Sequence, residues 1–400
     1  MKLRDWISIA TAVIMVLFAA WLHSTLDLEA DEDRVVKVGF VYEGDESTPY
    51  NSNFMRAQHA LEAAYGERAE IYAMCNVPYH KALDTLRTLA ERGCELVFVN
   101  SVGYVAAAKQ AASEYPGVQF CQAAGNTANT EPVLSNFHTF MGEISQGRYV
   151  SGVVAGLKLK ELTEAGTITP QQAKLGYVGA VPCPEVISGY TAFLLGVRSV
   201  VPEAVMTVRY TGTWSSYDLE KAAAEALLAE GCVILSQHSD TIGPAVACEA
   251  AAAERPVYLV GYNQSMMDAA PTTALVSCRI NWSPYVLSAF EAILEDDPIE
   301  KHVKGHVVGQ DAGAGFRRDW VQMVELNEYI AAPGTREVME EAIEDMRSGR
   351  TDVFRGPYTG VDPDDPTDTV DLSTGYGENR DSSAPTFHYI LEEIITVRED

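Results

Sequence analysis

The chain has 400 residues, of which 47% are hydrophobic and 21% are charged, a composition that is ordinary for a globular protein. One compact core rarely holds a chain of this length, so two domains are expected. The formal net charge is -27. Because so negative a field repels nucleic-acid phosphates and anionic lipid headgroups, we do not expect nucleic acid as a partner.

An apolar run without charges occupies residues 6–22, with Lys2 and Arg4 before it and an acidic stretch after it. Its length lies at the lower limit for a membrane-spanning helix, about 17 to 25 residues, and above that of a signal-peptide core, about 7 to 15. The positive charges on its amino side place Met1 in the cytoplasm and the remainder outside. We expect residues 1–34 to be a membrane anchor, or a cleaved signal segment, followed by a tether on the outer face of the cell membrane.

From residue 35 onward, strand-like and helix-like segments alternate. Residues 35–44 form an apolar run that ends in a Gly/Asp turn, and residues 52–66 repeat apolar side chains at helical spacing. The same alternation continues to residue 125. In this first series the expected strands are 35–44, 69–75, 95–101 and 118–125, and the expected helices are 52–66, 79–93 and 102–117.

A second series follows an expected long helix over residues 143–160. Its expected strands are 174–181, 204–212, 232–237 and 256–262, with helices that begin near Pro184, Ser216 and Ile242. Strands separated by helices of this length form right-handed βαβ units and a parallel sheet. Two such series predict an α/β fold of two doubly wound parallel-sheet lobes with a cleft between them.

The last third of the chain is expected to connect the lobes. Residues 273–282 and a helix over 283–296 should cross back to the first lobe. Extra strands, a helix over 333–349 and an exposed loop over 361–383, rich in Pro, Asp, Gly and Ser, should follow. The expected lobe boundaries are about 35–142 with 278–315 for the first lobe, and about 143–277 with part of 316–400 for the second.

The motifs of several enzyme classes are absent. No GxGxxG follows the first strand, and neither GxxxxGK[ST] nor GxSxG occurs, which argues against a dinucleotide fold, a P-loop and a serine-hydrolase elbow. His302 and His306 are four residues apart, but Gly305 and a strand-like context argue against a metal site. Glu185 and Asp240 need no reaction to explain them, since acids also accept hydrogen bonds from ligand hydroxyls. We expect no enzyme activity, no cofactor and no metal.

Aromatic and polar residues gather just after the expected strands. In open parallel sheets, ligands bind at this carboxyl edge. Aromatic faces stack on flat rings, while amides and carboxylates pair with hydroxyl groups, as a nucleoside or a sugar requires. Taken singly, each polar residue is also explained by turn chemistry. The candidate ligand-binding residues are Asp45, Tyr50, Asn51, Asn100, Ser101, Asn126, Glu185, Trp214, Gln237, Asp240 and Asn263.

Several segments resemble the basic membrane protein (BMP) family of ABC-transporter substrate-binding proteins, of the purine-nucleoside receptor type. They are VKVGFVYEGD, KLGYVGAVPCPEVISGYTAFLLGVRSVVPEA, TGTW, VGYNQS, LVSCRINWSPYV and DVFRGPY. The resemblance covers residues 35–400. It implies a type I periplasmic-binding fold, a small molecule held between the lobes, most of all a purine nucleoside, and ABC permease and ATPase subunits as partners.

The resemblance also assigns roles to individual residues. The family stacks the ligand's base on an aromatic side chain in the first loop, which Tyr50 matches, and on a second one in the opposite lobe, which Trp214 matches. Asn263 stands where an acidic residue commonly holds the ribose. Arg279 or Asn281 stands where the family has a lysine after the return strand, and Asn281 is therefore also a candidate for ligand binding.

Other functions remain open at this stage. A membrane-anchored sensor or receptor of the same fold would need no transporter. A nucleoside hydrolase would need a cluster of Asp ligands in the first loop, which offers only Asp45 and Glu46. A transcription regulator would need an amino-terminal helix-turn-helix, where this chain has its apolar run.

Overall fold

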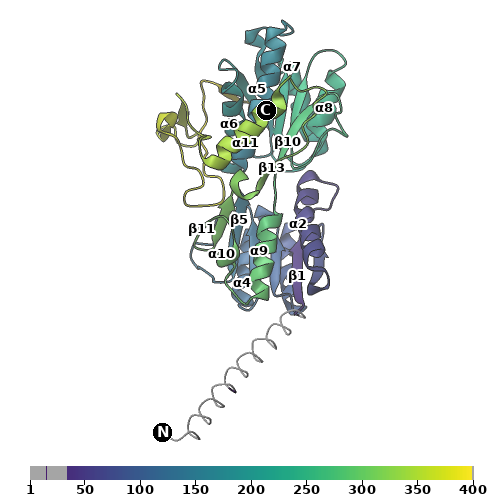
Figure 1. Ribbon diagram of the computed structural model, residues 1–400, viewed down its shortest axis with the longest axis vertical. Coiled ribbons are helices and arrows are strands. Elements are labelled where there is room, and N and C mark those ends of the chain that lie inside the picture. The colour runs from purple at the N-terminus through teal and green to yellow at the C-terminus, as the bar shows by residue number, and fades with distance from the viewer. Residues whose placement is uncertain (1–14, 16–33, 399–400) are drawn as a thin grey trace, which may run out of the picture.

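The structure is a computed structural model that describes residues 15 and 34–398. Two seven-stranded sheets, each flanked by helices, form two lobes stacked along the long axis of the molecule (Figure 1). Apart from Met15, the expected anchor at residues 6–22 lies outside the described residues. Within the part of the chain that is described, no helix combines the length and apolarity needed to span a membrane.

The first lobe is built on a sheet with the strand order β11-β12-β5-β4-β3-β1-β2. Neighbouring strands are parallel except for β11 and β12. The strands are β1 Val36–Val41, β2 Ala69–Met74, β3 Leu96–Val99, β4 Gln119–Ala123, β5 Phe137–Gly142, β11 His306–Val308 and β12 Asp311–Ala314, and the helices are α2 Pro49–Tyr65, α3 Ala82–Glu91, α4 Val105–Glu114, α9 Ser283–Leu294 and α10 Ile299–His302.

Helices cover both faces of this sheet. Leu96 and Phe98 of β3 belong to the same apolar cluster as Phe54 of α2. Val97 and Val99 pack instead in a cluster with side chains of α3 and α4. Because successive side chains of a strand point to opposite faces, the apolar run of β3 is buried on both sides, as in doubly wound sheets. This pattern confirms the expected α/β architecture of the lobe.

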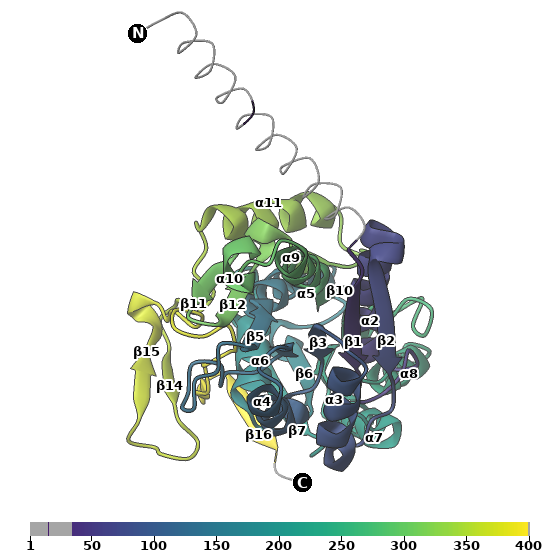
Figure 2. The ribbon, with the colours of Figure 1, turned by 90° about the horizontal axis from the view of Figure 1, so that it is seen from below.

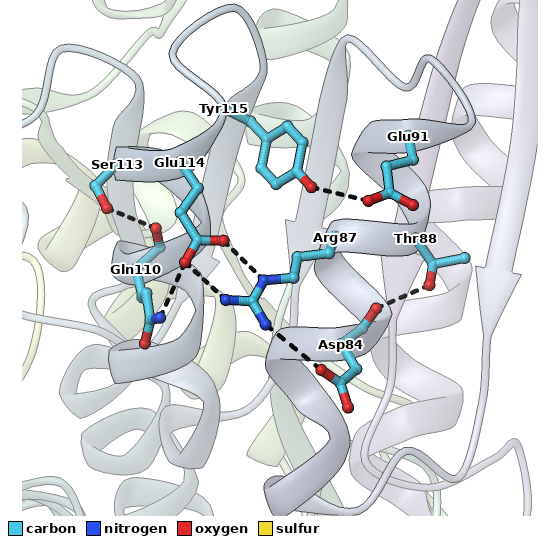
Figure 3. A network of polar contacts seen from close by, with 8 residues as sticks. All are labelled: Asp84, Arg87, Thr88, Glu91, Gln110, Ser113, Glu114 and Tyr115. Carbon is cyan, nitrogen blue, oxygen red and sulfur yellow. Dashed lines mark hydrogen bonds and ion pairs between the residues drawn. The ribbon is translucent and has the colours of Figure 1, made fainter.

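On the outside of the first lobe, α3 and α4 are joined by a polar network (Figure 3). Arg87 donates to Glu114 at 2.7 and 2.8 Å, and this pairing lowers the pKa of Glu114 to about 2. Tyr115 donates to Glu91 at 3.1 Å. Exposed ion pairs of this kind contribute little stability, and none of these residues lines the pocket described below.

The second lobe repeats the plan with the strand order β13-β10-β9-β8-β6-β7-β16. Only β13 runs antiparallel to its neighbour. The strands are β6 Lys174–Gly179, β7 Val205–Tyr210, β8 Ile234–His238, β9 Tyr258–Tyr262, β10 Ala274–Ile280, β13 Val321–Met323 and β16 Ile395–Arg398, and the helices are α5 Ile144–Glu164, α6 Pro184–Arg198, α7 Tyr217–Ala229, α8 Gly243–Ala251 and α11 Thr335–Ser348.

Two glycines allow α5 and α6 to approach each other closely. A Cβ atom on Gly152 of α5 would lie 2.1 Å from the carbonyl oxygen of Phe193, and one on Gly196 of α6 would lie 2.0 Å from that of Tyr149. Any larger residue would therefore push the two backbones apart. Because α5 directly follows β5, this contact fixes how the second lobe begins at the crossing from the first.

The lobe boundaries differ in places from those expected. β10 lies wholly in the second sheet, so the chain returns to the first lobe after Ile280, close to the boundary expected at about residue 278. Residues 137–142 form the strand β5, which we had not predicted. Arg34, expected as the end of the tether, pairs with Glu95 at 2.9 Å and with Asp296 at 2.8 Å and so belongs to the first lobe.

The carboxyl-terminal segment is more ordered than the sequence predicted. Within residues 361–383, expected to be an exposed loop, β15 (Thr369–Asp371) pairs with β14 (Thr359–Val361), and Ser383 is buried. This hairpin projects from the side of the molecule (Figure 2). Farther on, β16 adds a parallel edge strand to β7. The helix expected at residues 333–349 is confirmed as α11.

Candidate functional site

A pocket between the lobes lies at the carboxyl ends of both sheets. It holds about 390 Å³ of empty space, part of it open to solvent. Its lining residues are Glu43, Tyr50, Ser101, Val102 and Ala124 from the first lobe and Glu185, Trp214, Asp240 and Tyr262 from the second.

Glu43 supplies the acid of the first lobe. It follows β1 closely, and its carboxylate accepts hydrogen bonds from Tyr79 Oη and Ser101 Oγ, each at 2.6 Å. The sequence indicates Asp45 for this position. That side chain accepts from the Ser47 amide and from Asn76 Nδ2, both at 3.0 Å, and these bonds lower its pKa to about 2. Asp45 therefore shapes its own loop and does not line the pocket.

The predicted pair Asn51 and Asn100 supports the loop that carries Glu43. Asn100 Nδ2 donates to Asn51 Oδ1 at 2.8 Å, and Asn100 Oδ1 accepts from the Glu43 amide at 3.2 Å. Asn51 Oδ1 also accepts from the Gly44 amide at 3.3 Å. Both side chains are buried and neither lines the pocket, so their part is to hold the loop in place.

Tyr50 brings an aromatic ring to the pocket from the first turn of α2. Its hydroxyl donates to the carbonyl oxygen of Asn100, and its ring meets the edge of Trp282 with the ring centroids 6.4 Å apart. Burial raises the pKa of Tyr50 well above its usual value, so the hydroxyl stays protonated at neutral pH. The hydrogen bond of the hydroxyl and the contact of the ring with Trp282 together fix the orientation of Tyr50.

In the second lobe, His238 joins three lining residues. The centroid of its ring lies 6.3 Å from that of Trp214 and 4.8 Å from that of Tyr262. Its Nε2 lies 3.3 Å from Glu185 Oε1. Burial, aided by the positive charge of Arg148, lowers the pKa of His238 to about 4. The imidazole is therefore neutral at pH 7 and can donate from Nε2 to Glu185.

Tyr262 is backed by a buried arginine. The guanidinium of Arg148 lies 3.7 Å from the ring centroid of Tyr262, and its Nη1 donates to the carbonyl oxygen of Gln237 at 2.8 Å. Arg148 has no solvent exposure. This cation–π contact fixes the orientation of Tyr262, and Arg148 itself is not among the lining residues.

Asp240 is the lining acid whose carboxyl group has the fewest hydrogen-bond partners. Its side chain is buried, and its backbone amide donates to the carbonyl oxygen of Trp214 at 2.9 Å. Among the described residues, none donates a hydrogen bond to its carboxylate. Burial, reinforced by the charge of Glu43 across the cleft, raises the pKa of Asp240 well above its usual value.

Four other predicted residues lie away from the lining. Gln237 holds the loop after β8 by donating to Ser239 O and Thr241 O. Asn263 adopts a φ of 67°, and its buried Nδ2 has no partner among the described residues. Asn281 donates to Asp319 O at 2.9 Å beside the lobe crossing. Asn126 is exposed.

Of the twelve predicted residues, five line the pocket: Tyr50, Ser101, Glu185, Trp214 and Asp240. Sequence reasoning missed Glu43, Val102, Ala124 and Tyr262. Glu43 and Tyr262 directly adjoin or end apolar strands, and that position was the available signal. Other predicted residues hold the loops by their hydrogen bonds, as Asp45, Asn100 and Gln237 do.

The two histidines considered for a metal do not share a site. His302 lies with Glu295 and Asp297, and a second such group contains Asp362, Asp368 and His388; in each group the candidate ligand atoms lie within 4.8 Å of one another. His306 Nε2 instead lies 2.9 Å from the carbonyl oxygen of Arg380. Neither group touches the interlobe pocket.

Two parallel-sheet lobes that share one pocket at their strand ends define a two-lobed solute-binding protein. A family model described as "ABC transporter substrate-binding protein PnrA-like" matches residues 35–345. The chain therefore belongs to this family of ABC-transporter substrate-binding proteins, which confirms over residues 35–345 the resemblance read from the sequence. Proteins of this class work outside the cytoplasm.

Comparison with known proteins gives the same result. A purine-binding protein of Brucella abortus is 28% identical over 338 residues, covering 83% of this chain and 87% of the relative. A putative ABC-transporter glucose-binding protein of Haloferax volcanii is 32% identical over 245 residues, covering 61% and 57%. A solute-binding protein of Aeropyrum pernix shares the fold with a TM-score of 0.64 at 16% identity, over 79% of this chain and 92% of that one.

Proposed function

We propose that this substrate-binding protein captures a purine nucleoside, or a similar small molecule, between its lobes and delivers it to an ABC importer. The observation that carries the proposal is that Tyr50 and Trp214 line one pocket from opposite lobes. Two aromatic side chains at facing strand ends suit a flat purine, and the carboxyls beside them suit the hydroxyls of a ribose. The similarity to a purine-binding protein supports this choice.

Isothermal titration of the full-length chain tests the ligand. Adenosine, guanosine, inosine, adenine and glucose form the panel, with glucose included because one relative is a putative glucose-binding protein. We expect saturable one-to-one binding of at least one purine nucleoside and weaker or no binding of glucose. Binding of glucose alone would replace the purine proposal with a sugar proposal.

The site should bind its ligand without converting it. A carboxylate pair can also catalyse hydrolysis, so each nucleoside is incubated with the protein and analysed by chromatography for free base. We expect every nucleoside to be recovered intact. Release of base at a rate that scales with protein concentration would favour a hydrolase instead.

We also propose that the apolar run at residues 6–22 anchors the protein to the outer face of the cell membrane. The run is flanked by Lys2 and Arg4 on one side and by acids on the other, which is the arrangement that sets this orientation. Full-length protein should sediment with membranes and resist alkaline extraction. A protein that begins at Arg34 should be released, and its sedimentation with membranes would contradict the anchor.

A further inference from the structure

Three carboxyl groups converge on the interlobe pocket: Glu43 from the first lobe, and Glu185 and Asp240 from the second. No lysine or arginine is among the lining residues. The nearby cation, Arg148, is fully buried and stands against Tyr262. The surface offered to a solute is therefore acidic, with aromatic rings beside the acids.

The three acids differ in the hydrogen-bond partners that the protein gives to their carboxyl groups. Glu43 accepts from Tyr79 and Ser101, and Glu185 lies 3.3 Å from His238 Nε2. Asp240 differs, because its side chain is more than nine-tenths buried and has no donor among the described residues.

A neighbouring acid in α7 shows what a satisfied carboxylate looks like beside the same loop. Glu220, which is fully buried, accepts from Ser239 Oγ at 2.7 Å, from the Thr241 amide at 3.0 Å and from the Ser216 amide at 3.1 Å. Leaving a buried polar group without a partner is costly. The fold thus satisfies Glu220 from within, while Asp240 faces the pocket and awaits a donor from outside.

We infer that Asp240 is the specificity-determining residue of the pocket: it accepts hydrogen bonds from N–H or O–H groups of a neutral or cationic solute, and together with Glu43 and Glu185 it excludes solutes that carry phosphate or carboxylate. This inference rests on the proposed function, since it names the kind of solute that the same site takes. Nucleosides fit the rule, and their 5′-monophosphates do not.

The arrangement also couples ligand charge to lobe closure. Glu43 belongs to one lobe and Asp240 to the other, so closing the empty pocket brings two carboxyl groups together in a poorly solvated space, which disfavours their ionised forms and opposes closure as long as both are charged. A solute that donates to Asp240 removes this opposition. Only a ligand with different contacts in the open and closed states can shift their balance.

The test compares adenosine with adenosine 5′-monophosphate on the full-length wild type and on Asp240→Asn, using isothermal titration and thermal melting. The amide keeps the size of the side chain and removes its charge. We expect wild type to bind adenosine at least a hundredfold more tightly than the monophosphate. In the variant, adenosine affinity should fall about tenfold or more, as for loss of a hydrogen bond to a charged group. The difference in affinity between adenosine and the monophosphate should therefore become smaller.

The melting temperature of the unliganded variant separates a role in binding from a structural role. If Asp240 serves binding, removing this unpartnered buried acid should leave the melting temperature unchanged or raise it. A lower melting temperature with unchanged adenosine affinity would overturn the inference, and so would equal binding of adenosine and its monophosphate by wild type. Asp45→Asn, an acid of the first loop that does not line the pocket, is the matched control and should bind like wild type.

The two proposals fail in distinguishable ways. If wild type binds no nucleoside at all, the proposed function fails. The exclusion of anionic solutes, here called the charge rule, is then tested by comparing the binding of glucose and glucose 6-phosphate. If wild type binds a nucleoside and accepts its monophosphate equally well, the proposed function stands and the charge rule is wrong.

Discussion

At the scale of single residues, the side chains around the pocket form two groups. Some line the open space, and others hold the surrounding loops in place. Asn51 and Asn100 bond to each other and to the Glu43 loop, whereas Trp214 borders the pocket and contacts the core through His238. Both kinds follow strand ends, so their position in the sequence does not distinguish them. Only the hydrogen bonds do.

Trp214→Ala should weaken nucleoside binding about tenfold to a hundredfold. Stacking of a base on an aromatic side chain contributes about 1 to 3 kcal/mol, and each 1.4 kcal/mol is about a factor of ten. The side chain is only partly buried, so the melting temperature of the unliganded protein should change little. Titration calorimetry checks the affinity, and Tyr217→Ala, an exposed aromatic in the next helix, is the control. Wild-type affinity in the Trp214 variant would show that Tyr50 and Trp214 do not hold a base between them.

Glu378 should make the stability of the protein pH-dependent. Its side chain is buried, accepts from the Phe387 amide at 3.3 Å and has a pKa raised by burial to about 7. Because the folded-state pKa lies above the unfolded value, the stabilising contribution is complete below about pH 4.5 and is lost as the pH rises through 7. Between pH 5 and 8.5 this loss amounts to about 2 to 3 kcal/mol.

Urea unfolding at pH 5 and pH 8.5 measures this effect. Glu378→Gln cannot ionise, so the variant should lose less stability than wild type over the same interval. The comparison between the two proteins cancels the titration of all other groups. Parallel loss of stability in both would show that Glu378 does not carry the pH dependence.

At the scale of elements, the alternation of strands and helices was enough to predict both lobes. The apolar runs of β1, β3, β6 and β8 lie buried in their sheets as expected. The chain does cross back within residues 273–282, but the sequence did not show that β10 itself stays in the second sheet, because a strand's own sequence does not show which neighbour it pairs with. β10 hydrogen-bonds to β9 along most of its length, and that register keeps it in the second lobe.

The candidate site was predictable only in part, for a physical reason. Strand ends set the edge at which a ligand binds, and Tyr50, Glu185 and Trp214 were found by that rule. The rule does not state how far along each loop the pocket extends. Glu43 and Tyr262 stand closer to their strands than the residues chosen, and Asp45 is turned away by its bonds to Ser47 and Asn76.

The crossing of α5 and α6 gives a prediction at this scale. Gly196→Ala should destabilise the protein by about 1 to 3 kcal/mol, the usual cost of overpacking, because its Cβ would meet the Tyr149 carbonyl oxygen at 2.0 Å. Gly117→Ala is the control, since a Cβ there meets nothing within 4 Å. Urea unfolding measures both. Equal stability of the two variants would mean that the helices can separate without cost.

At the scale of the whole molecule, the chain crosses between the lobes three times: near residue 143, near residue 281 and between β12 and β13. Crossings of this kind form a hinge. The pocket draws lining residues from both lobes, so a bound solute contacts both and favours the closed state. Small-angle scattering should show a smaller radius of gyration when the nucleoside is added. An unchanged curve at saturation would argue against an interlobe site.

The carboxyl-terminal segment adds a fourth connection between the lobes. β16 pairs with β7 of the second lobe. Ser383, in the same segment, donates from its amide and its hydroxyl to Asp311 of β12 in the first lobe, each at 2.6 Å. This part of the chain follows residue 345, where the family match ends.

Weakening this connection should open the unliganded protein. Ser383→Ala removes one hydrogen bond to a buried carboxylate, worth about 1.5 to 3 kcal/mol, and so favours the open state of the hinge. The radius of gyration without ligand should rise, and the apparent nucleoside affinity should fall because fewer molecules are ready to bind. Ser373→Ala is the control, since its hydroxyl bonds within the segment to Asp371. If scattering and affinity match wild type in both variants, the segment does not restrain the hinge.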